Sequence, residues 1–143
     1  MQTCVVVVNA DPGLADLFWL TKDYLTSFRN LIPASLRMPG AWRAMLEGAL
    51  GAVTIQSFPA PHDCRDGFYH AYWRRPDAYL SADIRANISV FHRLDPRNVQ
   101  DDIQHLRRDL VSGVWAQANA RLLKHTELDV GRRIAVAELS AET

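Results

Sequence analysis

Several features that the 143-residue sequence lacks argue against whole classes of protein. It has no excess of either charge, because 16 lysines and arginines balance 16 aspartates and glutamates. Nucleic-acid-binding and membrane-surface proteins normally carry a basic excess, so this balance argues against both classes. No apolar run approaches the roughly 20 residues that a membrane-spanning helix needs. We therefore expect a globular protein with neither nucleic acid nor membrane as a partner.

Cysteine is scarce as well, and the start of the chain does not look like an export signal. Cys4 and Cys64 are the two cysteines. The apolar run near Met1 is too short for a signal peptide, and no basic residue precedes it. These features predict a cytoplasmic protein with free thiols rather than a disulfide. The length and the absence of an obvious linker predict a single domain over residues 1–143.

Three segments have the residue pattern of strands. Residues 4–8 are a continuous, mostly β-branched run, which predicts a strand covered on both faces. Residues 52–58 alternate apolar with polar side chains, as half-buried strands do. Residues 132–139 form a closing strand after a turn at residues 129–131.

Between the predicted strands, apolar residues recur at helical spacing. This spacing predicts helices over residues 14–31 and 42–50, with Gly51 ending the second. Ser81 and Asp95 are typical residues for the N-caps of two further helices, and Pro96 suits the first helical position. The predicted fold is α/β, a small three-stranded mixed sheet packed with five to seven helices.

The first predicted strand raises a question about partners. A strand as apolar as Val5–Val8 is a poor sheet edge, because its unpaired backbone groups invite pairing with another chain. We therefore expect a homo-oligomer or a hetero-complex formed through the Val5–Val8 edge.

Residues 59–76 hold the densest group of reactive side chains. They include two histidines, one thiol, two carboxylates and four aromatic rings, and they follow the strand predicted at residues 52–58. Open α/β sheets usually place their sites in loops that follow strand ends. We therefore take this segment as the candidate site, with a small-molecule substrate.

His62 is the first candidate for chemistry in this segment. An imidazole titrates near neutrality and serves as a general acid or base, and Asp63 and Asp66 are close enough in sequence to orient it. His62 and Asp63 are therefore predicted as catalytic residues. The alternative is that they only make hydrogen bonds that shape the loop.

Cys64 and Asp66 are predicted to bind substrate. Cys64 becomes a nucleophile if its pKa is lowered, and otherwise it is a packing thiol. The spacing of His62, Asp63, Cys64 and Asp66 fits no zinc signature, so no metal is expected.

The aromatic residues that follow are predicted to lie on a helix. Phe68, Tyr72 and Trp73, together with Tyr69, are suited to the wall of a pocket for an apolar substrate, or simply to the core. The remaining histidines, His70, His92, His105 and His125, are isolated and are predicted to be surface residues.

Residues 62–68 and 71–80 resemble a signature of one branch of the class I S-adenosylmethionine-dependent methyltransferases. Weaker similarities lie at residues 11–12, 18–20, 109–115 and 127–133. The resemblance spans nearly the whole chain but only the C-terminal half of that family. It implies a Rossmann-like half in which the last strand lies between the first two, antiparallel to both. The other edge of the first strand is then left open.

The sequence departs from the family in the part that holds the cofactor. There, a glycine-rich turn and an acidic residue in the N-terminal half bind S-adenosylmethionine. No three of the seven glycines here have the G-x-G-x-x-G spacing. The resemblance therefore implies a truncated, methyltransferase-like protein that supplies the substrate side. It binds S-adenosylmethionine only if a partner completes the site, so these residues alone have no cofactor-binding role.

Two alternatives remain open at this point. The chain is either a cofactor-free acid–base enzyme, such as a cyclase, dehydratase or isomerase, that uses His62 and Asp63 in the same pocket, or a non-catalytic dimeric binding module paired through Val5–Val8.

Overall fold

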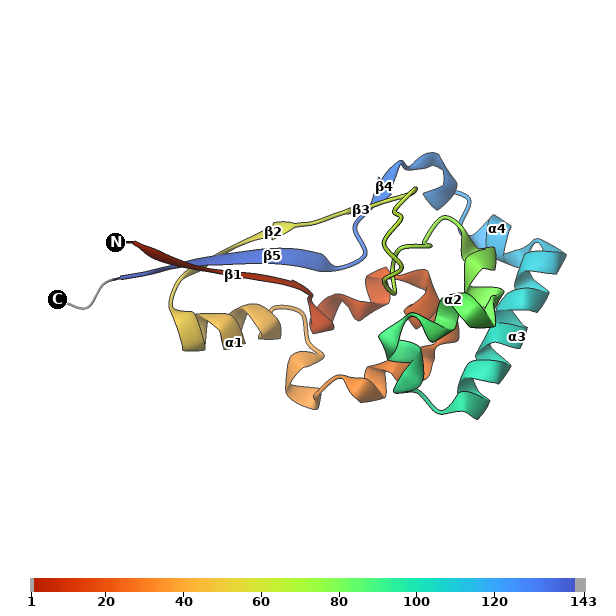
Figure 1. Ribbon diagram of the computed structural model, residues 1–143, viewed down its shortest axis with the longest axis horizontal. Helices are drawn as coiled ribbons and strands as arrows, with labels where there is room; N and C mark the ends of the chain where they lie inside the picture. Colours follow the sequence, from red (N-terminus) through yellow and green to blue (C-terminus); the bar gives the residue numbers. More distant parts are fainter. Residues whose placement is uncertain (1, 141–143) are drawn as a thin grey trace.

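A three-stranded sheet organises the computed structural model, which describes residues 2–140 (Figure 1). It contains β1 (Thr3–Ala10), β2 (Val53–Ser57) and β5 (Arg132–Leu139) in the order β1-β5-β2. Both hydrogen-bonded pairs are antiparallel, so β1 and β2 run in the same direction with the last strand between them. This confirms the predicted α/β fold and the central, antiparallel place of the last strand; because both described pairs are antiparallel, the sheet is antiparallel and not mixed as predicted.

One edge of β1 is paired over its whole length and the other is open. All eight residues from Thr3 to Ala10 are in register with Leu139 to Arg132 of β5. Within residues 2–140, no strand pairs with the opposite edge of β1. Its outward-facing backbone groups are therefore available for another strand.

The two faces of the sheet differ in what covers them. α1 (Ala41–Leu50) packs Trp42 and Leu46 against one face, on which Ala135 and Ala137 lie. On the other face Val6 is 58% exposed and Val8 is 55% exposed. Figure 1 shows α1 on one side of the sheet and no helix over the other. The prediction that both faces of the strand at residues 4–8 (β1) are covered is therefore wrong for the described residues.

The helical body lies beyond the carboxyl ends of β1 and β2 (Figure 1). It includes α2 (Ala82–Ala86), α3 (Pro96–Ser112) and α4 (Val114–Ala118). The predicted caps are confirmed: Ser81 Oγ accepts the Ile84 N–H at 3.3 Å, and Asp95 Oδ1 accepts the Arg97 N–H at 2.8 Å. Gly113, at φ 84°, ends α3 in the left-handed conformation.

The helix predicted over residues 14–31 is wrong. The chain forms three short segments instead, η1 (Pro12–Leu17), η2 (Leu20–Tyr24) and η3 (Thr26–Leu31), followed by η4 (Ala34–Leu36). The break at Phe18, which has φ −100° and ψ 121°, precedes a run in which residues 18–21 are all buried. One regular helix cannot turn four consecutive residues toward the same core, so the core determines the break.

The helix expected around Phe68–Trp73 is also wrong. Residues 67–75 form successive turns with hydrogen bonds three residues apart, such as Ala71 N–H to Phe68 O at 3.0 Å. Two buried side chains fix these turns. Trp73 Nε1 donates to Ala60 O at 3.0 Å, and Tyr79 Oη donates to Tyr69 O at 2.6 Å.

The remaining elements are short. A small ladder that the sequence pattern did not predict joins β3 (Ala60–Pro61) to β4 (Glu127–Leu128). η5 (Pro76–Leu80), η6 (Ser89–His92) and η7 (Leu122–Lys124) complete the helical body. Its core is built on buried aromatic and leucine side chains, among them Phe18, Trp73, Tyr79 and Leu106. No helix within residues 2–140 is long and apolar enough to cross a membrane.

Candidate functional site

The candidate site lies where β1 ends and the helical body begins. Asp11 follows β1, and its Oδ1 accepts the Gly13 N–H at 2.9 Å, which closes a tight turn. The Asp11 N–H donates to Gly131 O at 2.9 Å, tying this turn to the one that precedes β5. Two loops that are far apart in sequence are thereby held together at the carboxyl end of β1, the position where open α/β sheets bind ligands.

A cavity of about 310 Å³ opens beside these loops. Its volume is at the lower end of the range for small-molecule sites. Most of its lining is apolar, with a few polar side chains among them. The lining residues are Asn9, Ala10, Asp11, Pro12, Ala15, Thr21, Phe28, Leu31, Ile32, Tyr69, His70, Val90, Arg93 and Val130.

His70 is the imidazole that faces this cavity. Burial, and to a lesser extent the charge of the nearby Arg132 guanidinium, lowers the pKa of His70 from 6.5 to about 4. The ring lies among the Phe18, Tyr69 and Phe68 rings, and within residues 2–140 neither of its nitrogens makes a hydrogen bond. His70 is therefore neutral at pH 7, with one nitrogen free to accept a proton or a hydrogen bond.

The sequence-based prediction for His70 was wrong, because it treated this residue as an isolated surface histidine. The signal that distinguishes it is its position in an aromatic run, between Tyr69 and Phe68 on one side and Tyr72 on the other. The contact of this run with Phe18 becomes visible only in the folded turns, where the Phe18 ring lies against Tyr69 and His70.

Tyr69 forms part of the cavity wall but is already engaged. Its hydroxyl is hydrogen-bonded to Thr21 Oγ1 at 2.9 Å, and its ring is stacked on Phe28 with 5.2 Å between centroids. Burial raises the pKa of Tyr69 above its usual value, so the phenol stays protonated. Tyr69 therefore shapes the cavity and does not serve as a base.

The residues predicted as catalytic lie in the surface loop after β3. The His62 N–H donates to Thr126 O at 2.8 Å, while Asp63 and Asp66 are exposed. Cys64 is partly buried, and its carbonyl accepts from Arg75 at 2.8 Å. None of these four residues lines the cavity. Within the described part of the chain, no three His, Cys, Asp or Glu side chains gather as metal ligands do.

The three predicted substrate-binding aromatics occupy different environments. Trp73 is completely buried in the core. Tyr72 packs edge-on against Tyr79 at 5.5 Å between centroids. Phe68 contacts the Arg132 guanidinium at 4.3 Å, and Phe58 contacts the same guanidinium at 4.4 Å. Phe68 lies beside the His70 ring, and none of the three residues lines the cavity.

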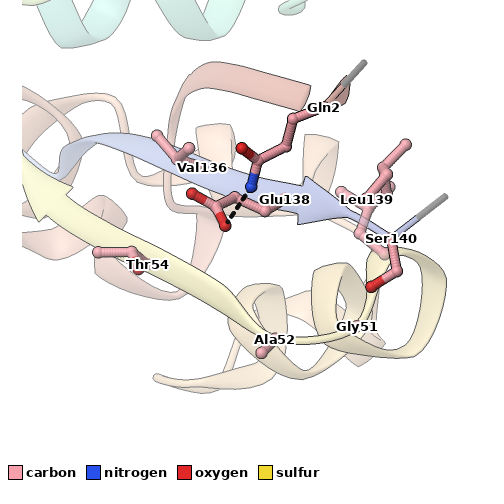
Figure 2. A pocket seen from close by; sticks show the side chains of 9 residues that line it. Gln2, Gly51, Ala52, Thr54, Val136, Glu138, Leu139 and Ser140 are labelled. Atoms are coloured by element: carbon pink, nitrogen blue, oxygen red, sulfur yellow. Dashed lines mark hydrogen bonds between the residues drawn. The ribbon is translucent and has the colours of Figure 1, made fainter. Parts of the chain in front are cut away.

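A second hollow, of about 920 Å³, lies at the opposite end of the sheet (Figure 2). It borders the uncovered face at Thr54 and Val136, and its one carboxylate, Glu138, accepts from Gln2 Nε2 at 3.1 Å. Although this hollow is the larger, it contains no histidine, cysteine or arginine. It offers little chemistry, and we therefore take the smaller cavity as the candidate site.

S-adenosylmethionine is the cofactor that the sequence resemblance implies, and the turn after β1 is not built to hold it. Holding such a cofactor requires glycines whose backbone a ligand can approach closely. Gly13 is the glycine in the turn after β1, and a Cβ placed on it would meet Met38 O at 2.5 Å. Protein backbone therefore already fills the space in front of this glycine, and no cofactor cradle is built here.

The comparison with solved structures agrees with the sequence resemblance. The chain is similar to the crystal structure of a "Putative methyltransferase from antibiotic biosynthesis pathway" from Anabaena variabilis, with 28% identity and a TM-score of 0.74. The match covers 94% of this chain and 54% of that one, so the chain spans about half the length of the protein it matches. No protein-family model and no curated protein matches the sequence. The fold is thus that of about half of a methyltransferase-like structure.

Proposed function

We propose that these residues form the substrate-side half of an S-adenosylmethionine-dependent methyltransferase, and that a complementary half of the fold holds the cofactor. The observation that supports this most is the unequal coverage of the structural match, 94% of this chain against 54% of the other. The open edge of β1 and the bare face beside it lie where a further part of such a sheet is expected to pack.

In this proposal, the cavity at the end of β1 holds the methyl acceptor. S-adenosylmethionine, when bound by the complementary half, supplies an electrophilic methyl group. The apolar part of the lining contacts the acceptor, and the free nitrogen of His70 accepts a hydrogen bond, and then the proton, from it. His62 and Asp63, in the loop after β3, are proposed as further catalytic residues.

The experiment that tests this proposal is reconstitution. The purified chain is mixed with the portion of the Anabaena methyltransferase that the match leaves uncovered, and the molar mass of the mixture is measured by light scattering. We expect a 1:1 complex formed through the edge and the bare face of β1. Because Val6 is 58% exposed on that face, Val6→Lys should weaken the complex without unfolding the chain.

The matched control is Val111→Lys on α3, where the side chain is 85% exposed and far from the sheet. A complex that survives Val6→Lys as well as it survives Val111→Lys, or no complex at all, would contradict the proposal. If the chain alone forms a dimer that Val6→Lys splits, the β1 edge pairs two copies instead, as expected for a dimeric binding module.

A second candidate function keeps the cavity and dispenses with the cofactor. The imidazole of His70 lines the cavity and makes no hydrogen bond within residues 2–140, so it is placed to accept a hydrogen bond or a proton from a substrate, as isomerisation or dehydration would require. Cofactor-free turnover that is lost in His70→Gln and kept in His62→Gln would select this function and assign the base.

A further inference from the structure

The walls of the cavity indicate the shape of its ligand. The rings of Phe28 and Tyr69 stack on each other with an angle of 5° between their planes. Both residues contribute to the lining. Aliphatic side chains complete the apolar part, namely Leu31, Ile32, Val90 and Val130. The hydrogen bond between the Tyr69 hydroxyl and Thr21 Oγ1 orients the Tyr69 ring in this wall. A volume of about 310 Å³ with such a wall suits a small, flat apolar body of one ring better than an extended chain.

A cation lies at this cavity without an acidic partner. Arg93 follows η6, contributes to the lining and is exposed. The ion pairs formed within residues 2–140 do not include Arg93. A guanidinium has a planar set of donors that matches a carboxylate. Arg93 is therefore placed to receive an acidic group on the ligand.

Two further polar side chains of the cavity can each accept a hydrogen bond. His70 presents an imidazole that makes no hydrogen bond within the described chain, and Asp11 uses Oδ1 for the Gly13 N–H, which leaves Oδ2 free. Acceptors of this kind suit a hydroxyl group, which donates. Asp11 also disfavours a second negative charge near this side of the cavity.

We propose that the cavity binds a small hydroxylated aromatic carboxylic acid, with its ring against Phe28 and Tyr69, its carboxylate on Arg93 and its hydroxyl on His70. The inference rests on the proposed function in one respect: such a molecule is then the methyl acceptor, and its hydroxyl is the group that receives the methyl. Binding itself requires neither cofactor nor partner.

The test is an NMR titration of the isotope-labelled 143-residue chain with 4-hydroxybenzoate. We expect amide shifts at Ala10, His70 and Val130, and none at Leu46 under the sheet. Methyl 4-hydroxybenzoate, which lacks the charge, should bind about tenfold more weakly, as expected for the loss of one charge-assisted hydrogen bond worth about 1.4 kcal/mol. Benzoate, which lacks the hydroxyl, should also bind more weakly.

Two variants assign the contacts. Arg93→Gln should weaken the binding of 4-hydroxybenzoate about tenfold and leave the binding of the methyl ester unchanged. Arg97→Gln, at an exposed arginine outside the cavity, should change the affinity for neither ligand. His70→Gln should reduce the preference for 4-hydroxybenzoate over benzoate. The amide spectrum of each variant shows that it is folded.

The inference is overturned if the cavity amides do not shift, if the ester binds as tightly as the acid, or if Arg93→Gln behaves like Arg97→Gln. Because the titration contains no S-adenosylmethionine and no partner chain, its failure leaves the reconstitution experiment standing. Conversely, ligand binding without reconstitution would keep this inference and reject the methyltransferase half.

Discussion

His70 shows how the environment of one residue changes its chemistry. The same imidazole on the surface would titrate near neutrality, but among aromatic rings and near Arg132 its pKa falls to about 4. The unfolded chain returns it to about 6.5. Protonation therefore favours unfolding between these two values, and the contribution of His70 to stability is complete above pH 6.5 and lost as the pH falls toward 4.

This linkage gives a prediction for the stability of the protein. As the pH falls from 6.5 to 4, the free energy of unfolding should decrease less in His70→Gln than in the wild type. The difference between the two decreases should be on the order of 2–3 kcal/mol. Urea denaturation across this pH range measures the difference. His125→Gln, at an exposed histidine, is the control. If both variants follow the wild-type curve, the His70 ring is not desolvated as described.

At the scale of elements, the sequence predicted those parts whose formation depends on local chemistry. β2, β5, α1 and α3 have clear alternation, spacing or caps, and they form close to where they were expected. Residues 14–31 and 67–75 do not form the helices that were expected. In these segments the core requires several consecutive side chains, such as residues 18–21, to point inward. That requirement comes from the rest of the fold and has no local signal.

The candidate site was predicted only in its general neighbourhood. The segment 59–76 does contribute to it, through Tyr69 and His70. Trp73, which was predicted to bind substrate, is completely buried in the core, as the alternative had it, and does not line the cavity. The other walls come from residues 9–12, 15, 21, 28, 31, 32, 90, 93 and 130. Tertiary contacts such as Asp11 N–H to Gly131 O bring them together, and spacing in the sequence does not show these contacts.

The turn after β1 provides a stability prediction for an element. A Cβ on Gly13 would lie 2.5 Å from Met38 O and 2.8 Å from Met38 C, both of them backbone atoms. Gly13→Ala should therefore lower the free energy of unfolding by about 1–3 kcal/mol, as overpacking does. Gly48 lies in α1 with nothing within 4 Å of its Cβ position. Gly48→Ala should raise stability by about 0.5–1 kcal/mol through helix propensity.

Chemical denaturation of the two glycine variants decides this point, because they make the same chemical change with opposite expected signs. Equal stabilisation of both would mean that residues 12–17 do not pack against Met38 as the structure shows. The turn that positions Asp11 at the cavity would then be placed differently.

At the scale of the whole molecule, the helical body is well packed, whereas the sheet is only partly covered within residues 2–140. The helical body beyond β1 and β2 (Figure 1) contains the aromatic core, and the candidate cavity lies where this body meets the end of β1. The sheet, by contrast, leaves one face and one edge of β1 uncovered within residues 2–140. The unpaired backbone groups along the open edge of β1 invite a further strand. This asymmetry, together with a match to about half of a methyltransferase-like structure, is the basis of the proposed function.

The measurement that tests this account most directly is titration calorimetry of S-adenosylmethionine into the purified chain, alone and in an equimolar mixture with the complementary methyltransferase portion. The account predicts binding weaker than about 1 mM for the chain alone and micromolar binding for the mixture, a gain of roughly 4 kcal/mol. Micromolar binding of S-adenosylmethionine by the 143 residues alone would contradict it.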